Sequence, residues 1–211
     1  MEDAVAIIRD GDVVASSGYG GNGTPDELFV ALEERFVRTG SPRDLTLVFA
    51  GGQGDGVDKG LSHLGHEGLV RRVIGGHFGL MPSIERLIVE DRIEAYNFPE
   101  GVVTQLYRDI AAGKPGTLSR VGLGTFVDPR HGGARMNART TEELVRVVDV
   151  DGEEYLFFRA FPIGVALIRG TTADPDGNVT MERESLALAA RNSRGVALCQ
   201  VERIAGESTL D

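Results

Sequence analysis

The stretch VVASSGYGGNGTPDELFVALEERFVRTG, residues 13–40, decides the fold class. It begins with a short apolar strand, Val13–Ser17, passes through a glycine-rich turn, and continues as a helix, Thr24–Thr39, whose apolar side chains recur at helical spacing. The residues that mark the start of this helix as a capping box are Thr24, Pro25 and Glu27. A strand, a glycine loop and an amphipathic helix in this order form the repeating unit of an α/β protein.

The same alternation continues along the chain and predicts an open, mostly parallel sheet with helices on both faces. The further strands that we expect are Leu45–Phe49, Arg72–Ile74, Ile93–Tyr96, Arg120–Leu123, Val165–Ile168 and Val196–Val201. The further helices that we expect are Ala4–Arg9, Ile84–Val89, Val102–Ala112 and Leu186–Asn192. A hairpin, Val145–Val150 and Glu154–Phe158 around Asp151-Gly152, interrupts the alternation. Because no repeat or linker is visible, residues 1–211 are expected to form a single domain.

Charge and composition limit the possible partners. The formal net charge is −10, so nucleic acid and anionic membrane are disfavoured because their phosphates would be repelled. The chain has no apolar run near the ~18 residues of a membrane span and no signal-peptide core. The single cysteine, Cys199, lies in the apolar run Val196–Val201, which favours a small buried strand residue over a reactive thiol. We therefore expect a cytoplasmic protein without disulfides.

Glycine-rich loops follow the predicted strands. They are Ser17–Leu28, Ala50–Gly56, Gly75–Gly79 and Val121–Phe126. In an open α/β sheet, ligands bind at the carboxyl ends of the strands, and glycine lets the backbone approach a ligand closely. The residues that we expect to bind substrate are Gly18, Gly20, Gly23, Gly51, Gly52, Gln53, Gly76, His77, Gly124 and Thr125. The alternative is that these loops are ordinary tight turns.

The first loop has the spacing of a dinucleotide fingerprint, G-x-G-x-x-G, at Gly18, Gly20 and Gly23. Such a fingerprint also needs an acidic residue at the end of the next strand, where it binds the ribose. Here the strand Leu45–Phe49 runs into Ala50-Gly51-Gly52 instead. NAD binding is therefore disfavoured.

Metal and serine chemistry are also disfavoured. The residues that could suggest a metal are His63, His66, Glu67 and His77. Their spacing is not that of H-E-x-x-H, and no thiol or carboxylate cluster completes a ligand set, so polar loop or interface histidines are the better interpretation. Ser17 and Ser62 have no obvious triad partners, which argues against a serine hydrolase.

Six segments, taken in order, resemble the N-terminal half of the family I CoA-transferases, and most of all the single-chain acetate or propionate type. The segments are SGYGGNGTPDEL, GSPRDLTLVFAGGQGDG, HEGLVRRVIGGHFGL, AYNFPEGVVTQLYRDIAAGKPG, VGLGTFVDPR and IRGTTADPDGNVTMERE. The resemblance covers essentially the whole chain. It implies a CoA-transferase α-type domain that works with a β-type domain or subunit, as part of an oligomer.

The resemblance also implies a ping-pong exchange of coenzyme A between an acyl-CoA and a short-chain carboxylic acid. In the family, a glutamate carboxylate attacks the thioester, and coenzyme A then forms a thioester with that glutamate, so covalent catalysis divides one difficult transfer into easier steps. The coenzyme A thioester is a substrate, and no permanently bound cofactor is implied. The nucleophilic glutamate belongs to the C-terminal half of the family, which this chain does not contain, so the chain alone is expected to be inactive.

One position departs from the family. The family has an N-P-Q-G-like segment whose glutamine amide is a candidate to stabilise an oxyanion, and here Asn97-Phe-Pro-Glu-Gly101 places Glu100 at that position. An ionised carboxylate accepts hydrogen bonds and cannot donate them. Glu100 is therefore either an altered oxyanion-hole residue, or a base or nucleophile in an acyl-CoA hydrolase of the same fold, or a rim carboxylate facing solvent. A non-catalytic CoA-binding module is the alternative from another functional class.

Overall fold

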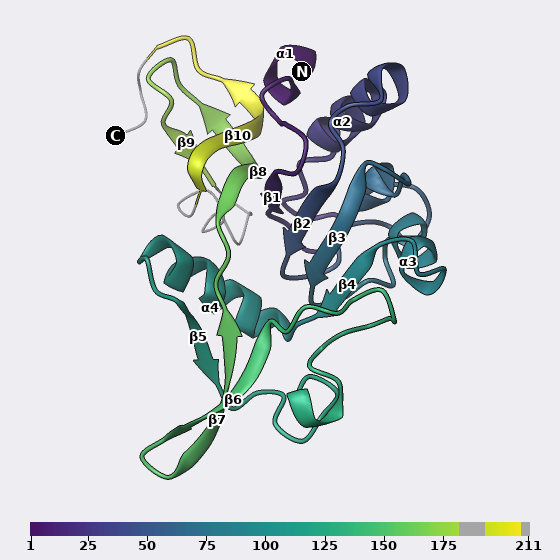
Figure 1. The fold of residues 1–211 in the computed structure, drawn as a ribbon. Helices are drawn as coiled ribbons and strands as arrows, with labels where there is room; N and C mark the ends of the chain where they lie inside the picture. Colours follow the sequence, from purple (N-terminus) through teal and green to yellow (C-terminus); the bar gives the residue numbers. More distant parts are fainter. Residues whose placement is uncertain (182–192, 208–211) are drawn as a thin grey trace.

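The main element of the fold is an open parallel sheet. The computed structural model describes residues 1–181 and 193–207 (Figure 1). Six strands follow the order β10-β8-β1-β2-β3-β4 and run parallel, and a short seventh strand, β9, pairs antiparallel with β8. These strands are β1 (Val13–Ser16), β2 (Leu45–Phe49), β3 (Val70–Gly75), β4 (Glu94–Asn97), β8 (Ile163–Ala173), β9 (Val179–Thr180) and β10 (Ser193–Ile204). The predicted open, mostly parallel sheet is confirmed.

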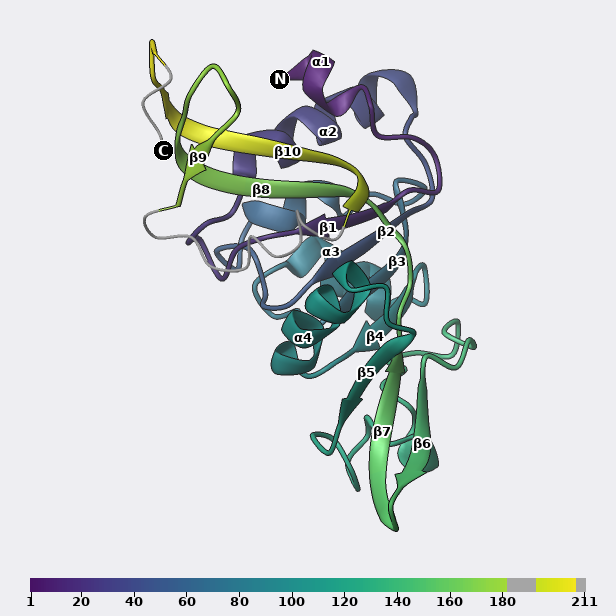
Figure 2. The same ribbon diagram turned by 90° about the vertical axis from the view of Figure 1, so that its left-hand side faces the viewer.

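Helices cover both faces of this sheet (Figures 1 and 2). The helical segments on the first face are α1 (Glu2–Val5), α2 (Asp26–Thr39), η1 (Gly60–Leu64) and α3 (Pro82–Val89). Helix α4 (Glu100–Ala111) packs on the second face. Strand β2 supplies both cores because its pleat alternates: Leu47 and Phe49 pack in the first core, and Val48 packs in the second.

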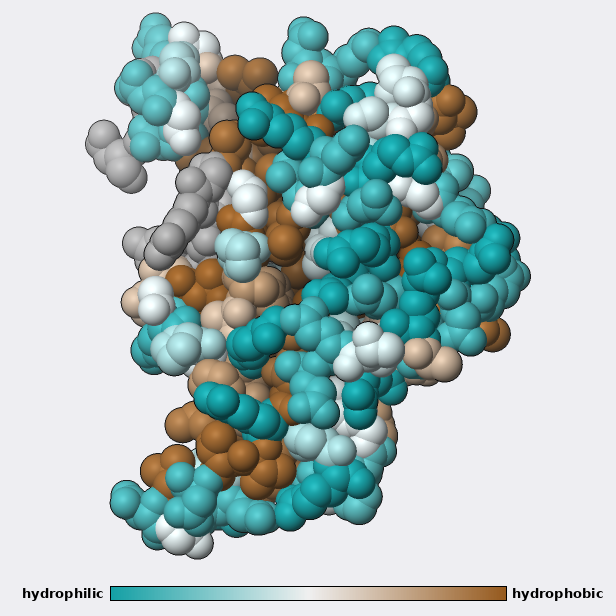
Figure 3. Space-filling model, viewed as in Figure 1, coloured by the Kyte–Doolittle hydropathy of each residue, from teal (hydrophilic) through white to brown (hydrophobic). Residues whose placement is uncertain are grey.

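A smaller antiparallel sheet extends from the second face. Its strands are β5 (Gly116–Ser119), β6 (Val145–Val150) and β7 (Glu153–Arg159), in the order β5-β7-β6. Asp151 and Gly152 have φ of 55° and 84°, as the two-residue turn of the predicted hairpin requires, so the hairpin is confirmed. Leu118 in β5 is 49% exposed. Figure 3 shows an apolar region over the part of the molecule that β5 and β7 form.

The long irregular stretch after β5 has a structural role at the edge of the main sheet. The amide of Asn97 donates to the carbonyl of Ala134 (2.9 Å), and the amide of Met136 donates to the carbonyl of Ala95 (3.0 Å). These bonds satisfy the outer edge of β4, which would otherwise present unpaired backbone groups. The stretch includes one 3₁₀ turn, η2 (Pro129–His131).

One predicted strand is wrong. The segment Arg120–Leu123 forms a turn, and the strand is β5, which ends at Ser119. Gly122 and Gly124 adopt φ of 100° and 71°. These positive values are incompatible with an extended strand, so the apolar residues between the glycines do not continue one.

The start of α2 and the end of the N-terminal helix also differ from the prediction. Thr24 does not cap α2, because its hydroxyl donates to the carbonyl of Gly20 (2.9 Å) and the amide of Glu27 donates to the side chain of Gln200 (3.1 Å). The N-terminal helix ends at Val5 rather than at Arg9. The side chain of Arg35 donates to backbone carbonyls in this N-terminal turn, so a residue distant in sequence replaces helical hydrogen bonds. The predicted helix Leu186–Asn192 lies outside the described residues.

Candidate functional site

Three glycine-rich loops meet at the carboxyl edge of the main sheet. They are loop 1 (residues 17–25, after β1), loop 2 (residues 50–59, after β2) and loop 3 (residues 76–81, after β3). Gly20 joins loops 1 and 2, because its amide donates to the carbonyl of Gly52 (2.7 Å) and its carbonyl accepts from the amide of Gly54 (3.2 Å). Loops 2 and 3 are joined by the amide of Gly76 and the carbonyl of Ala50 (2.9 Å). The loops therefore form one hydrogen-bonded layer.

Glycines in this layer make room for side chains from neighbouring elements. A Cβ atom would lie 2.3 Å from Cδ2 of Tyr19 at Gly51, 2.6 Å from Nδ1 of His77 at Gly52, and 2.3 Å from Cγ of Glu100 at Gly76. Real Cβ atoms essentially never approach another atom this closely, so a side chain at any of these positions would force its neighbour to shift. These three predicted glycines thus make room for Tyr19, His77 and Glu100 along one edge of the sheet.

The polar groups of these three side chains have no hydrogen bond or ion pair among the described residues. Tyr19 is 58% exposed, His77 is exposed, and Glu100 is half-buried. A large aromatic ring that remains exposed above a fixed backbone is a common feature of surfaces that bind a ligand or another chain. Tyr19, His77 and Glu100 therefore present a hydroxyl, an imidazole and a carboxylate to a ligand or a second chain that binds at this edge.

The short segment from Asn97 to Glu100 is fixed at both of its ends. It is the first residue of α4, and the side-chain amide of Asn97 donates to the carbonyl of Gly76 (3.0 Å), which ties this segment to loop 3. The unpaired amides at a helix N-terminus favour a nearby negative charge. The carboxylate of Glu100 can therefore accept a hydrogen bond from a ligand at this edge.

Three of the predicted substrate-binding residues, Gly18, Gly23 and Gln53, have structural roles inside the loop layer. Gly18 and Gly23 adopt positive φ values of 119° and 64° at the bend of loop 1. The hydroxyl of Ser17 donates to the carbonyl of Gly23 (3.2 Å). Gln53 is fully buried beneath the loops, where its Nε2 donates to the carbonyl of Ser16 (3.4 Å). Its Oε1 has no hydrogen-bond partner in the described part of the chain.

The fourth predicted loop does not join this layer. It follows β5 in the smaller sheet, and its hydrogen bonds are internal: Gly124 donates to Asp128 (3.0 Å), and the hydroxyl of Thr125 donates to the carbonyl of Gly122 (2.8 Å). Asp128 is buried, and hydrogen bonds from the Arg130 guanidinium hold the pKa of its carboxyl well below the usual range. Gly124 and Thr125 therefore contribute to a separate loop held by a charged pair.

A cavity of ≈ 520 Å³ lies between loop 1, loop 2 and β8. Its charged lining residues are Asp26, Asp55, Lys59 and Arg169. Asp26 accepts a hydrogen bond from the amide of Gly60 (2.7 Å). Asp55 accepts from backbone amides that include those of Val57 (2.9 Å) and Lys59 (3.2 Å), and these bonds lower the pKa of its carboxyl. The sequence indicated no role for Lys59 or Arg169. Lys59 lies outside the segments that resemble the family, Arg169 lies inside one of them without a predicted role, and only the strand order brings β8 beside loop 1.

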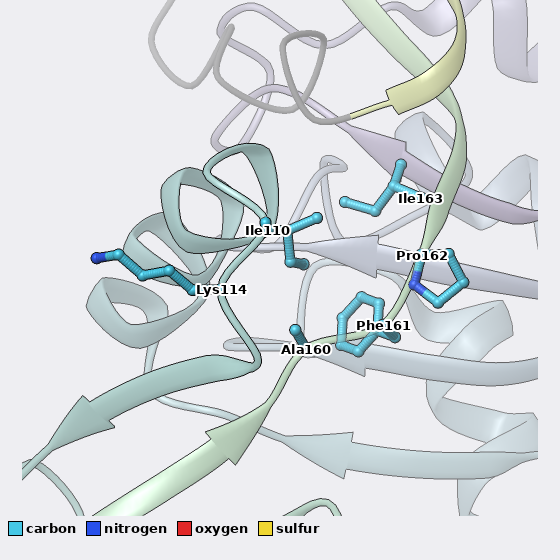
Figure 4. A pocket seen from close by; sticks show the side chains of 7 residues that line it. Ile110, Lys114, Ala160, Phe161, Pro162 and Ile163 are labelled. Atoms are coloured by element: carbon cyan, nitrogen blue, oxygen red, sulfur yellow. The ribbon is translucent and has the colours of Figure 1, made fainter.

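A second hollow, of ≈ 230 Å³, lies at the opposite edge of the sheet. Figure 4 shows it between the end of α4, with Ile110 and Lys114, and the segment that enters β8, with Phe161 and Ile163. The amino ends of parallel strands rarely carry the ligand site. We therefore place the functional site at the glycine-rich edge.

The histidines that could have suggested a metal have another role. His63 and His66 both contact the carboxylate of Glu33, at 2.7 Å and 2.6 Å, and so join η1 and the turn after it to α2. Within residues 1–181 and 193–207, no three His, Cys, Asp or Glu side chains are grouped to hold a metal ion. Within the same residues, no helix is long and apolar enough to cross a membrane. Cys199 lies half-buried on β10.

The similarity to known proteins extends over the whole chain. The profile of the Coenzyme A transferase family matches residues 1–211. The chain belongs to this family. It is 42% identical to caffeate CoA-transferase of Acetobacterium woodii, over 99% of this chain and 41% of that protein. It is 32% identical to the acetate CoA-transferase subunit alpha of Escherichia coli K12, over 91% of this chain and 76% of that subunit.

Solved structures of CoA-transferases show the same fold. The acyl-CoA transferase of E. coli O157:H7, solved as a thioester complex with CoA, superposes with a TM-score of 0.95 and 38% identity, over all of this chain and 43% of that chain. The chain thus spans about two fifths of the length of the caffeate CoA-transferase and of the E. coli O157:H7 enzyme. The inferred resemblance to the α-type half of a family I CoA-transferase is confirmed.

Proposed function

We propose that this chain is the α-type half of an enzyme that moves coenzyme A between an acyl-CoA and a short-chain carboxylic acid. The observation that carries the proposal is the layer of three glycine-rich loops, which presents Tyr19, His77 and Glu100 at the carboxyl edge of a CoA-transferase fold. The acetate and caffeate CoA-transferases among its relatives support an acid acceptor.

The proposed reaction is a ping-pong exchange. A glutamate carboxylate, supplied by a β-type domain or subunit, attacks the thioester carbonyl and displaces the CoA thiolate, which leaves a mixed anhydride. The thiolate then attacks the glutamyl carbonyl of that anhydride, releases the first carboxylate, and leaves a glutamyl-CoA thioester. The acceptor carboxylate repeats both steps in reverse and regenerates the glutamate. The thioester complex with CoA known for an E. coli relative supports this intermediate.

The role of this chain is to form one wall of the site. The fixed backbone of loops 1, 2 and 3 supports a thioester that approaches the edge, since preorganised groups lose little entropy on binding. Because the nucleophile comes from the β-type half, the chain alone is expected to be inactive. Two features support such a partner. The chain spans about two fifths of the length of two of its relatives, and Leu118 and Tyr19 are large hydrophobic residues left exposed.

Glu100 decides between transfer and hydrolysis. In a transferase, replacing its carboxylate with an amide supplies a donor, and one oxyanion donor contributes roughly 3 kcal/mol. In a hydrolase that uses Glu100 to activate water, the same change removes the base and lowers kcat by about 100-fold or more. The hydrolase is the second candidate because the carboxylate is unpaired among the described residues and lies at the edge.

The test compares Glu100→Gln with the native, full-length enzyme. Transfer is measured from acetyl-CoA to a panel of short-chain acids, and hydrolysis is measured with the acid omitted. We expect transfer by Glu100→Gln to equal or exceed that of the native enzyme. Glu85→Gln is the matched control, because Glu85 is an exposed glutamate in the first turn of α3. If the kcat of hydrolysis falls about 100-fold in Glu100→Gln but not in Glu85→Gln, and both variants fold normally, the enzyme is instead a hydrolase that uses Glu100.

A further inference from the structure

The cavity between loop 1, loop 2 and β8 lies at a special place in the topology. From β1 the chain adds β2, β3 and β4 on one side, whereas β8 and β10 lie on the other side. The strand order therefore reverses between β1 and β8, and in open α/β sheets ligands bind at the carboxyl end of such a reversal, where the loops diverge. Arg169 on β8 and Gly20 in loop 1 line the cavity at this point.

Four of the residues that line the cavity are glycines, namely Gly20, Gly21, Gly54 and Gly60. A Cβ atom at Gly54 or Gly60 would lie 2.2 Å from a backbone oxygen, so both positions require glycine. At Gly20 and Gly21 a Cβ atom would meet nothing within 4 Å. The space beside loop 1 is thus open because these two residues lack side chains.

The donors that remain unused in this cavity are cationic. The two carboxylates, of Asp26 and Asp55, already accept backbone hydrogen bonds from loop 2 and its continuation. The ammonium group of Lys59 has no hydrogen bond or ion pair within the described residues. Arg169 pairs with Glu202 through one terminal nitrogen (2.7 Å), but its Nε is buried and has no acceptor among the residues that the structure describes. A buried charged donor without an acceptor is unfavourable, and a ligand oxygen would satisfy it.

We propose that Lys59 and Arg169 bind an oxyanion of the substrate, a phosphate or a carboxylate group, in this cavity. Naming the source of the oxyanion rests on the proposed function: it is either a phosphate of coenzyme A or the carboxylate of the acceptor acid. Arg169 supplies a directed N–H donor, and Lys59 supplies a point charge at the end of a flexible chain. Glu100 does not line this cavity: it follows β4 as the first residue of α4 and packs against Gly76 in loop 3.

The test uses the native, full-length protein and two variants. Lys59→Gln removes the charge, and Gly21→Leu fills the cavity at a position where φ is not positive and no atom is close. The chain has only two lysines, so Lys114→Gln at the opposite edge is the matched control. The first probe is inorganic phosphate, whose protection against thermal unfolding reports binding without any assumption about the reaction. We expect Lys59→Gln to weaken the phosphate affinity about tenfold, Gly21→Leu to abolish protection, and Lys114→Gln to leave it unchanged.

The second set of probes identifies the source of the oxyanion. If Lys59→Gln raises the Kd of CoA but not that of dephospho-CoA, the ligand group is the ribose phosphate, and if it raises only the KM for acetate, the group is the carboxylate. The proposal is overturned if phosphate protection, CoA affinity and the acetate KM are the same in both variants as in the native protein. Transfer activity that persists in that case leaves the proposed function standing. Protection that depends on Lys59 in a native protein without transfer activity supports the site and refutes the function.

Discussion

Gly76 provides the sharpest test of how the loop layer holds Glu100. A Cβ atom at Gly76 would lie 2.4 Å from the carbonyl oxygen of Ala50 and 2.3 Å from Cγ of Glu100. Real contacts of this kind stay beyond 3.0 Å, so at least 0.6 Å of movement is forced on the loop 2 backbone. Gly76 does not have a positive φ, so the effect of Gly76→Ala is steric and not conformational. Overpacking of this size costs about 1–3 kcal/mol.

The predicted outcome has two parts. Thermal unfolding of Gly76→Ala should begin about 3–10 °C lower than that of the native enzyme. The kcat/KM for CoA transfer should fall at least about tenfold, because the loop 2 backbone forms a wall of the proposed site and a misplacement near 1 Å can cost about 100-fold. Gly101→Ala is the matched control: Gly101 lies one residue after Glu100, meets nothing within 4 Å, and belongs to a helix in which alanine is favoured by about 0.5–1 kcal/mol.

A double variant separates the two contacts. Adding Glu100→Ala to Gly76→Ala removes the side-chain contact but not the contact with the carbonyl of Ala50, so most of the stability loss should remain. If Gly76→Ala unfolds at the same temperature as the native enzyme and keeps its kcat/KM, loop 3 is not packed against loop 2 and Glu100 as described, and the reasoning fails.

Two further predictions concern single contacts. Gly51→Val forces the Tyr19 ring away from loop 2, and Gly20→Val places a β-branched residue at a φ of 59°. Both variants should reduce kcat/KM by more than their loss of stability explains. Normal kcat/KM in both would mean that the loops are ordinary turns. Asp128→Asn should lower the unfolding temperature at pH 7, since the folded pKa of Asp128 is depressed by Arg130. That stabilisation is present above the unfolded pKa of about 3.9 and is lost as the pH falls through the lower folded value. The difference in unfolding temperature between the native protein and Asp128→Asn should therefore narrow below about pH 4. A difference that stays constant from pH 7 to pH 3 would contradict the role given to Asp128.

Much of the fold could be predicted because the relevant signals are local. Helix α2 ends at Thr39 as expected, since Gly40 adopts a left-handed φ of 70° that stops a helix at low cost. The β6–β7 hairpin follows in the same way from Asp151 and Gly152. These features depend on the conformational preferences of a few consecutive residues, and such preferences are written in the sequence.

The site could be predicted only in part. The sequence indicated that glycine-rich loops follow strands, and three of the four loops do meet at one edge. The fourth follows β5, which pairs with β7 in the smaller sheet, and no local signal separates that strand from those of the main sheet. Gln53 reads as a loop residue, yet the tertiary structure buries it completely.

The residues that the sequence alone could not connect are those brought together by strand order. Arg169 lies about 150 residues from loop 1 in the chain, and its backbone amide nevertheless donates to the hydroxyl of Ser17 (3.3 Å). Strand order is decided by which apolar faces pack together over the whole domain, a competition among distant segments that no short window of sequence contains. The sequence by itself therefore determined the local units and the family, whereas packing decided which loops form the site and that Lys59 and Arg169 border one cavity.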